Sequence, residues 1–446
     1  MLLNMCPGGA PVMLALHAPD RLFSGSVVLV FSLVVAAVLA VALRRLTRQA
    51  DHRVPALMGV TAAFIFAAQM VNFPIAMGIT GHLLGGTLAA ILLGPWAASV
   101  VMASVILFQA LLGDGGLTAL GPNIFNMGLV GTLIAWLVYR AAAGSAPSSA
   151  RQVGAAFFAA WFAVVLASVF ASVQLAVSGS VSLFRILPAM VGCHMAIGVG
   201  EAAITAAVLA FVLRTRPEVA RAAAGPAGGQ RSVVLGGLAL SMVVALGLSL
   251  LPTLWDYPDG LEYVGIEKGL LIEEPEESPD GELLSLPAYP LGVRLKLVDG
   301  RPTAVHRYEV QGGALQVGDR IEAIEGRAVS DLASAAEALR LGEGEPPQGL
   351  IPGQSVTVTV RRGDRLLDLH LSAAAAPVAG SVAPLVALLP DYTFPGVDGL
   401  ISTSLAGGLG TLIMFVLSFA VGRALVRPGR LEAAYLAQTA AGDGGD

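Results

Sequence analysis

Residues 69–127 constrain the fold most, because this stretch is apolar almost throughout and long enough to cross a membrane more than once. The whole chain is 55% hydrophobic and only 13% charged, which is the composition of an integral membrane protein. Ionisable side chains are costly in hydrocarbon, so those inside such a stretch usually line a pathway or hold a substrate. The polar residues set into this one, among glycine-rich breaks, are His82, Asp114, Asn123 and Asn126.

Other apolar runs predict the remaining membrane helices. Residues 82–113 are broken at Gly94-Pro95, which predicts two short helices, the first spanning only if other helices shelter it. The fold class is therefore an all-α polytopic membrane protein with about nine membrane helices. The other predicted spans are residues 24–44, 54–75, 119–141, 152–177, 184–213, 232–252 and 399–425.

Four arginine clusters orient these helices, because positive charge collects on the cytoplasmic side. All four share that side only if the N-terminus is outside and the C-terminus inside. Residues 253–398 contain no apolar run of spanning length, so this topology makes them extracytoplasmic. We expect a multi-pass protein of the cell (inner) membrane. The clusters are Arg44, Arg45, Arg48 and Arg53; Arg140 and Arg151; Arg214, Arg216 and Arg221; and Arg423, Arg427 and Arg430.

Four motifs in residues 16–213 resemble the CbiM/NikM family, the substrate-specific membrane components of energy-coupling-factor (ECF) transporters for cobalt and nickel. The resemblance implies capture of Ni(II) or Co(II) outside and release inside, feeding cobalamin or nickel-enzyme synthesis. It also implies separate ECF ATPase subunits and a coupling (T) membrane subunit, so the chain itself is not an enzyme. No permanent cofactor and no nucleic acid is expected. The motifs are Gln69–Pro74, Gly81–Gly86, Gly113–Leu117 and Asn123–Gly128.

The resemblance implies that His17 and His82 bind the metal. Residues 16–20 resemble the family's opening motif, in which a histidine follows the initiator methionine. An α-amine, a backbone amide and two imidazoles would form a square-planar set that suits Ni(II) or Cu(II). Because residues 1–15 precede Leu16 here, three explanations compete. Translation begins at Leu16, which we favour, or the extension is removed, or the site uses other ligands.

The remaining polar residues are predicted to support the site. Asp20 is expected to accept a hydrogen bond that fixes a histidine tautomer. His194 and Glu201 share one helix face and form either a buried structural pair, which we favour, or a second station on the metal's path. Further candidates for interhelical hydrogen bonds or for ordering the loop over the site are Asn72, Asp114, Asn123 and Asn126.

The segment around residues 286–373 resembles a PDZ domain. The resemblance rests on Leu291-Gly292-Val293, on Gly313–Ile321 and on a helix-like stretch at 330–339. Strand-like alternation at 354–361 and 366–371 would close a small α+β sheet. A PDZ groove usually binds a peptide C-terminus by strand addition. The alternative is a spacer or packing platform.

Motifs on either side of this segment, at 256–262 and 390–396, resemble the small two-helix partner CbiN/NikN, here fused to the main component. The predicted organisation is an extension at 1–15, a CbiM/NikM-like domain at 16–213, a cytoplasmic linker at 214–231, a first CbiN-like helix at 232–252, the extracytoplasmic segment at 253–398, a second CbiN-like helix at 399–425 and a cytoplasmic tail at 426–446.

Two other functional classes fit the sequence less well. A PDZ domain between membrane helices also occurs in site-2 metalloproteases, but these need a His-Glu-x-x-His zinc motif, and none of the six histidines precedes a glutamate. The Gly-x-Ser-Gly of rhomboid proteases and the phosphate-binding loop of ATPases are also missing from the sequence. A passive metal channel or sensor is the second alternative.

Overall fold

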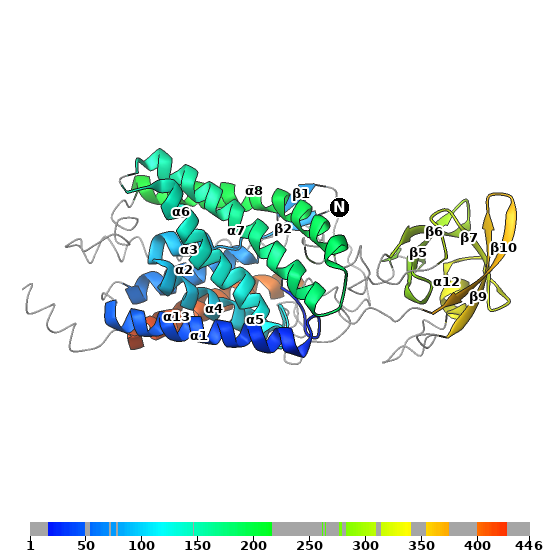
Figure 1. The fold of residues 1–446 in the computed structure, drawn as a ribbon, viewed down its shortest axis with the longest axis horizontal. Coiled ribbons are helices and arrows are strands. Elements are labelled where there is room, and N and C mark those ends of the chain that lie inside the picture. Colours follow the sequence, from blue (N-terminus) through cyan, green and yellow to red (C-terminus); the bar gives the residue numbers. More distant parts are fainter. Residues whose placement is uncertain are drawn as a thin grey trace, which may run out of the picture. The chain divides into compact units, whose positions relative to one another are not determined.

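The computed structural model describes residues 17–49, 54–70, 73–76, 79–145, 147–215, 261, 264, 276–278, 282–308, 314–339, 354–373 and 399–425. The chain divides into two compact units (Figure 1). The helical unit comprises Leu14–Leu261 and Ala383–Asp446, and the sheet unit comprises Glu262–Val382 together with Met1–Met13.

The helical unit is built from apolar helices. Six of those described are long and apolar enough to cross a membrane, and α2 is a shorter apolar helix. The predicted spans at 24–44, 152–177 and 184–213 correspond to α1, α7 and α8, whereas 232–252 lies outside the described residues. The elements are α1 (Gly25–Gln49), α2 (Val54–Gln69), β1 (Phe73–Ala76), β2 (Ile79–Gly81), α3 (Gly86–Leu93), α4 (Pro95–Leu112), α5 (Leu120–Asn123), η1 (Ile124–Ile134), α6 (Ala135–Ala143), α7 (Ser149–Val177), α8 (Leu183–Thr215) and α13 (Gly399–Leu425).

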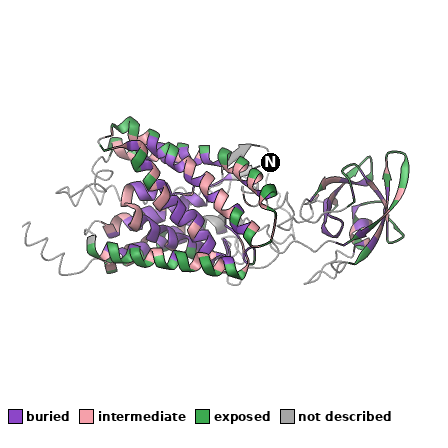
Figure 2. Cartoon of the chain, in the orientation of Figure 1, coloured by how far each residue is buried: buried purple, intermediate pink, exposed green. Residues whose placement is uncertain are grey.

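Residues inside the helical unit are buried, and many on its outer helix faces are exposed (Figure 2). Several of the exposed residues are large and apolar. Leu29 and Leu33 on α1 are 60% and 62% exposed, and Phe184 on α8 is 91% exposed. Exposed apolar side chains on helices of this length and hydropathy are those that contact lipid.

The break predicted within residues 82–113 is present. Helix α3 ends at Leu93, Gly94 has φ +79°, and Pro95 stands in the first turn of α4. Glycine tolerates positive φ, and proline is favoured in the first helical turn, where its missing N–H is not needed.

The predicted span at 119–141 is a composite of three elements. Helix α5 leads into η1, a π-helix of 11 residues, and then into α6. Gly86 packs directly against η1, because a Cβ added there would lie 2.9 Å from the carbonyl carbon of Gly131. Stretches of π-helix occur frequently at functional sites.

Helix α13 packs along α2 through small residues. A Cβ added at Gly59 would lie 2.9 Å from the carbonyl oxygen of Phe415, and one added at Gly422 would lie 2.7 Å from the Cα of Pro55. Small residues allow membrane helices to approach closely and gain van der Waals contact. The C-terminal helix is thereby built into the helical unit.

The sheet unit is an antiparallel sheet with one short helix. The strand order is β10-β9-β7-β6-β5-β4-β3, with β8 paired to β7. The predicted strands at 354–361 and 366–371 are the β9–β10 hairpin, and the predicted helix is α12. The elements are β3 (Glu276–Glu277), β4 (Leu283–Ala288), η2 (Tyr289–Leu291), β5 (Val293–Val298), β6 (Arg301–Arg307), β7 (Arg320–Ile324), β8 (Arg327–Ala328), α12 (Leu332–Ala338), β9 (Ser355–Arg362) and β10 (Arg365–Ser372).

Strand β5 is paired on both of its edges. It pairs with β6 on one side and with β4 on the other, where Leu286 lies opposite Leu295. Leu286 also joins the core that contains Leu332 of α12. The edge of β5 nearest α12 is the one that β4 occupies. A peptide that added to β5 at this edge would therefore have to displace β4.

An ion pair between the buried Asp319 and the partly exposed Arg362 fixes the turn before β7. Arg362 contacts both carboxylate oxygens of Asp319 at 2.6 Å. Burial works against ionisation of Asp319, but the Arg362 hydrogen bonds and charge outweigh it and lower the pKa of this carboxyl.

Candidate metal site

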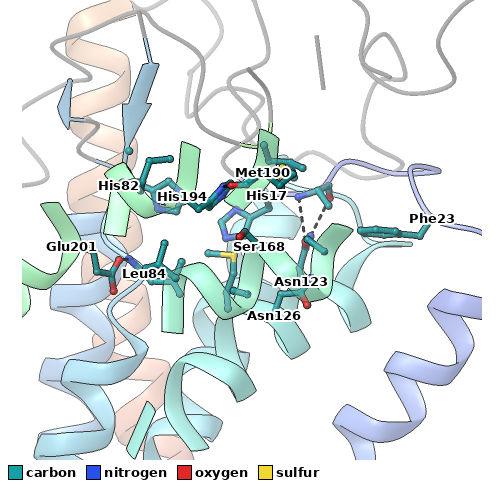
Figure 3. Close-up of a pocket in the computed structure, with 18 residues that line it drawn as sticks. His17, Phe23, His82, Leu84, Asn123, Asn126, Ser168, Met190, His194 and Glu201 are labelled. Carbon is teal, nitrogen blue, oxygen red and sulfur yellow. Dashed lines mark hydrogen bonds between the residues drawn. The ribbon is translucent and has the colours of Figure 1, made fainter. Parts of the chain in front are cut away.

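A cavity of about 90 Å³ in the helical unit brings together residues from distant parts of the chain. Its walls come from the segment before α1, the loop after β2, the α5–η1 junction, α7 and α8. Three imidazoles line it (Figure 3). Among its lining residues are His17, His82, Asn123, Asn126, His194 and Glu201.

The rings of His17 and His82 are spaced to share one ion. Their centroids lie 6.2 Å apart with an interplanar angle of 37°, and the residues are only 2% and 9% exposed. A metal–nitrogen bond of about 2 Å puts each ring centre about 3 Å from the ion, so imidazoles on opposite sides of it have centres about 6 Å apart.

One ring nitrogen of His17 contacts a carboxylate, and the other makes no hydrogen bond to the described residues. Nδ1 lies 3.1 Å from Oδ1 of Asp114. Nε2 is buried and has no hydrogen-bond partner among the described residues. Metal-binding histidines commonly donate one N–H to a carboxylate and present the other nitrogen to the metal. Nε2 of His17 therefore has the surroundings of a metal ligand.

Asp114 is a carboxylate that contacts the imidazole of His17, whereas Asp20 holds the nearby turn. Asp20 accepts hydrogen bonds from the backbone N–H and the hydroxyl of Thr118, both at 2.6 Å. Asp20 thus ties the segment before α1 to the glycine-rich turn (residues 113–118), and Asp114 in that turn contacts the imidazole.

Asn123 and Asn126 hold the backbone and the helices around the cavity. The side chain of Asn123 accepts from the N–H of Ala18 at 3.2 Å and donates to its carbonyl at 3.0 Å (dashed in Figure 3). Asn126 forms a reciprocal pair with Gln174 of α7, at 2.8 and 3.0 Å. Asn72 and residues 1–16 lie outside the described part of the chain.

The His82 loop (residues 81–85) is held from two sides. The carboxylate of Glu201 accepts the backbone N–H groups of Leu84 and, at 3.1 Å, of Gly85. Gln69 donates to the carbonyl of Leu84 at 2.9 Å. Glu201 therefore holds this loop through its backbone N–H groups.

The described residues include no group of three or more His, Cys, Asp or Glu side chains placed to hold a metal ion together. His17 and His82 are two imidazoles that line the same cavity, and Asp114 contacts the ring of His17 while Glu201 holds the loop of His82.

Substitution of Gly115 tests whether the glycine-rich turn (residues 113–118) holds His17 in place. It has φ +96°, and a Cβ added there would lie 2.6 Å from the Cβ of His17. We expect Gly115→Ala to weaken Ni(II) binding by at least about 10-fold, as loss of a supporting contact around a ligand does. Gly179→Ala is the matched control, because Gly179 has φ +78° but nothing within 4 Å of an added Cβ. Equal Ni(II) affinities of the two variants in equilibrium dialysis would contradict this role of the turn.

Comparison with known proteins places the chain in a family. A family model described as the cobalt uptake substrate-specific transmembrane region, CbiM, matches residues 17–219, and the PDGLE domain matches residues 359–427. A protein described as a fused nickel transport protein, NikMN, from Archaeoglobus fulgidus is 37% identical over 279 residues, covering 62% of this chain and 88% of that protein. The fused nickel transport protein NikMN of Rhodobacter capsulatus is 33% identical over 233 residues, covering 48% of this chain and 67% of that protein. A crystal structure of a truncated transition metal transporter is 30% identical, with a TM-score of 0.40, covering 44% of this chain and 98% of that one.

The chain therefore belongs to the CbiM/NikM family of nickel and cobalt transport proteins, in the fused form that also carries a PDGLE domain. It is a multi-pass membrane component of a transition-metal transporter. The resemblance to the CbiM/NikM family stated from the four motifs is confirmed, and the PDGLE match includes the CbiN-like motif at 390–396.

Proposed function

We propose that this chain captures Ni(II) or Co(II) between His17 and His82, as the substrate-binding component of an ATP-driven ECF-type importer. The observation that carries the proposal is the buried Nε2 of His17, which has no hydrogen-bond partner among the described residues and belongs to a ring 6.2 Å from that of His82. Imidazole nitrogens suit nickel and its neighbours in the first transition series.

Two imidazoles leave coordination positions for other donors. The resemblance implies the backbone amide of His17 and an α-amine at Leu16, if the chain starts there. A chelate through a histidine's own backbone amide uses Nδ1, because only that nitrogen closes a six-membered ring. In the structure Nδ1 contacts Asp114, so this chelate requires the ring of His17 to turn over.

The topology predicted from the arginine clusters supports a direction for metal capture. With the N-terminus outside, His17 and the loop before His82 lie on the outer side, and metal enters there. The sheet unit then lies outside as well, and we propose that it serves as a packing platform, because β5 is paired on both edges. Partner subunits, an ATPase pair and a coupling membrane subunit, would supply the energy.

Uptake measurements test this function. Cells lacking their own nickel uptake should accumulate radioactive nickel or cobalt when they express this chain with candidate ATPase and coupling subunits. Accumulation should fall to background when the phosphate-loop lysine of the ATPase is replaced, because the partners then cannot hydrolyse ATP. Accumulation that persists without the ATPase would instead support the passive-channel alternative.

A further inference from the structure

His194 is the third imidazole of the cavity, and it is not among the two rings that are spaced to share one ion. It lies on α8, is half-buried, and faces the same space as His17 and His82 (Figure 3). An ionisable side chain on a membrane helix is costly and usually has a function in the transport path.

The hydrogen bond of His194 fixes which nitrogen can bind a metal. Nδ1 lies 2.8 Å from the carbonyl oxygen of Met190, one helical turn earlier. A carbonyl only accepts, so Nδ1 carries the proton and Nε2 carries the lone pair. The ring is therefore held in the tautomer that binds a metal through Nε2.

His194 is close to the metal pair without completing a three-residue site. No three His, Cys, Asp or Glu side chains in the described part of the chain are placed to hold one ion. A third imidazole in the same cavity that is not grouped with the other two fits a step that follows capture.

Helix α8 links His194 to His82. Glu201 lies seven residues after His194 on roughly the same helix face. Its carboxylate holds the backbone N–H groups of Leu84 and Gly85 in the His82 loop. Glu201 therefore connects the His82 loop to the helix that carries His194.

We propose that His194 takes over the metal ion from His82 as the ion leaves the capture site. A bond from the metal to Nε2 of His194 forms while the bond to His82 breaks, with no change in oxidation state and with the proton kept on Nδ1. The inference rests on the proposed function and assigns His194 to release, whereas His17 and His82 perform capture.

His194→Asn separates this role from a structural one, because the asparagine NH₂ takes the place of Nδ1 and preserves the bond to Met190 while Nε2 is lost. The full chain is loaded with Ni(II) in lipid nanodiscs, and the metal is withdrawn by excess EDTA. We expect unchanged bound nickel and melting temperature, with release slowed at least about 10-fold, the scale of losing one contact to a bound metal. His306→Asn, in the sheet unit, is the control and should release at the rate of the unmodified chain.

Two results would overturn the proposal. Release at the unmodified rate would leave His194 with a structural role only. Weaker binding of nickel by His194→Asn would make His194 a ligand of the capture site itself. Failure of the proposed function is a separate result, recognised by His82→Ala binding nickel as well as the unmodified chain.

Discussion

Replacing His82 with alanine is expected to lower the affinity for Ni(II) and Co(II) by more than about 100-fold, because one of the two imidazoles that can face the ion is lost, a larger change than loss of a supporting residue. The loop that carries His82 is held by Glu201 and Gln69 through backbone groups, so the fold should survive the change. Equilibrium dialysis with elemental mass spectrometry measures the bound metal, and thermal melting reports on the fold.

His306→Ala is the control for the His82 variant, because it removes a histidine from the sheet unit. It should bind metal like the unmodified chain. If His82→Ala and His306→Ala retain the same amount of nickel, His82 is not a ligand and the site has been assigned to the wrong residues.

Replacing Glu201 with alanine is expected to lower both stability and metal affinity. Glu201 is 1% exposed and accepts two backbone N–H groups of the His82 loop. Each buried donor left unpaired costs about 1–3 kcal/mol. Melting temperature and Ni(II) affinity should therefore fall together, in contrast to His82→Ala, which should lose only the metal.

Glu201→Gln removes the negative charge of residue 201 but keeps a side chain of the same length that can reach the His82 loop. Its single carbonyl oxygen can still accept from one of the two N–H groups, so we expect values between those of the unmodified chain and of Glu201→Ala in both measurements. Full metal affinity in Glu201→Ala would show that the His82 loop keeps its position without this carboxylate, and would contradict its role in orienting His82.

The helical skeleton could be predicted from the sequence because its causes are local. A run of apolar residues of spanning length has few alternatives in a membrane. Gly94-Pro95 ends one helix and begins another through the conformations of those two residues alone. The strands of the β9–β10 hairpin could be predicted from the strand-like alternation of residues in the sequence.

The parts that could not be predicted depend on contacts between distant residues. The π-helix at Ile124–Ile134 has the same apolar composition as an α-helix, so only packing distinguishes the two. The partners of Glu201 are backbone N–H groups, which carry no signal in the side-chain sequence. The contact of Asp114 with His17 depends on how the glycine-rich turn folds over the segment before α1.

X-ray absorption at the nickel edge of the loaded chain tests the central claim most directly. A metal held by His17 and His82 should show a first shell of nitrogen at about 2 Å, with the outer-shell scattering of two imidazole rings. His82→Ala, measured with nickel at saturating concentration, should lose the contribution of one ring. A shell of oxygen or sulfur without imidazole scattering, or an identical spectrum for the variant, would contradict the assignment of these two histidines as the metal ligands.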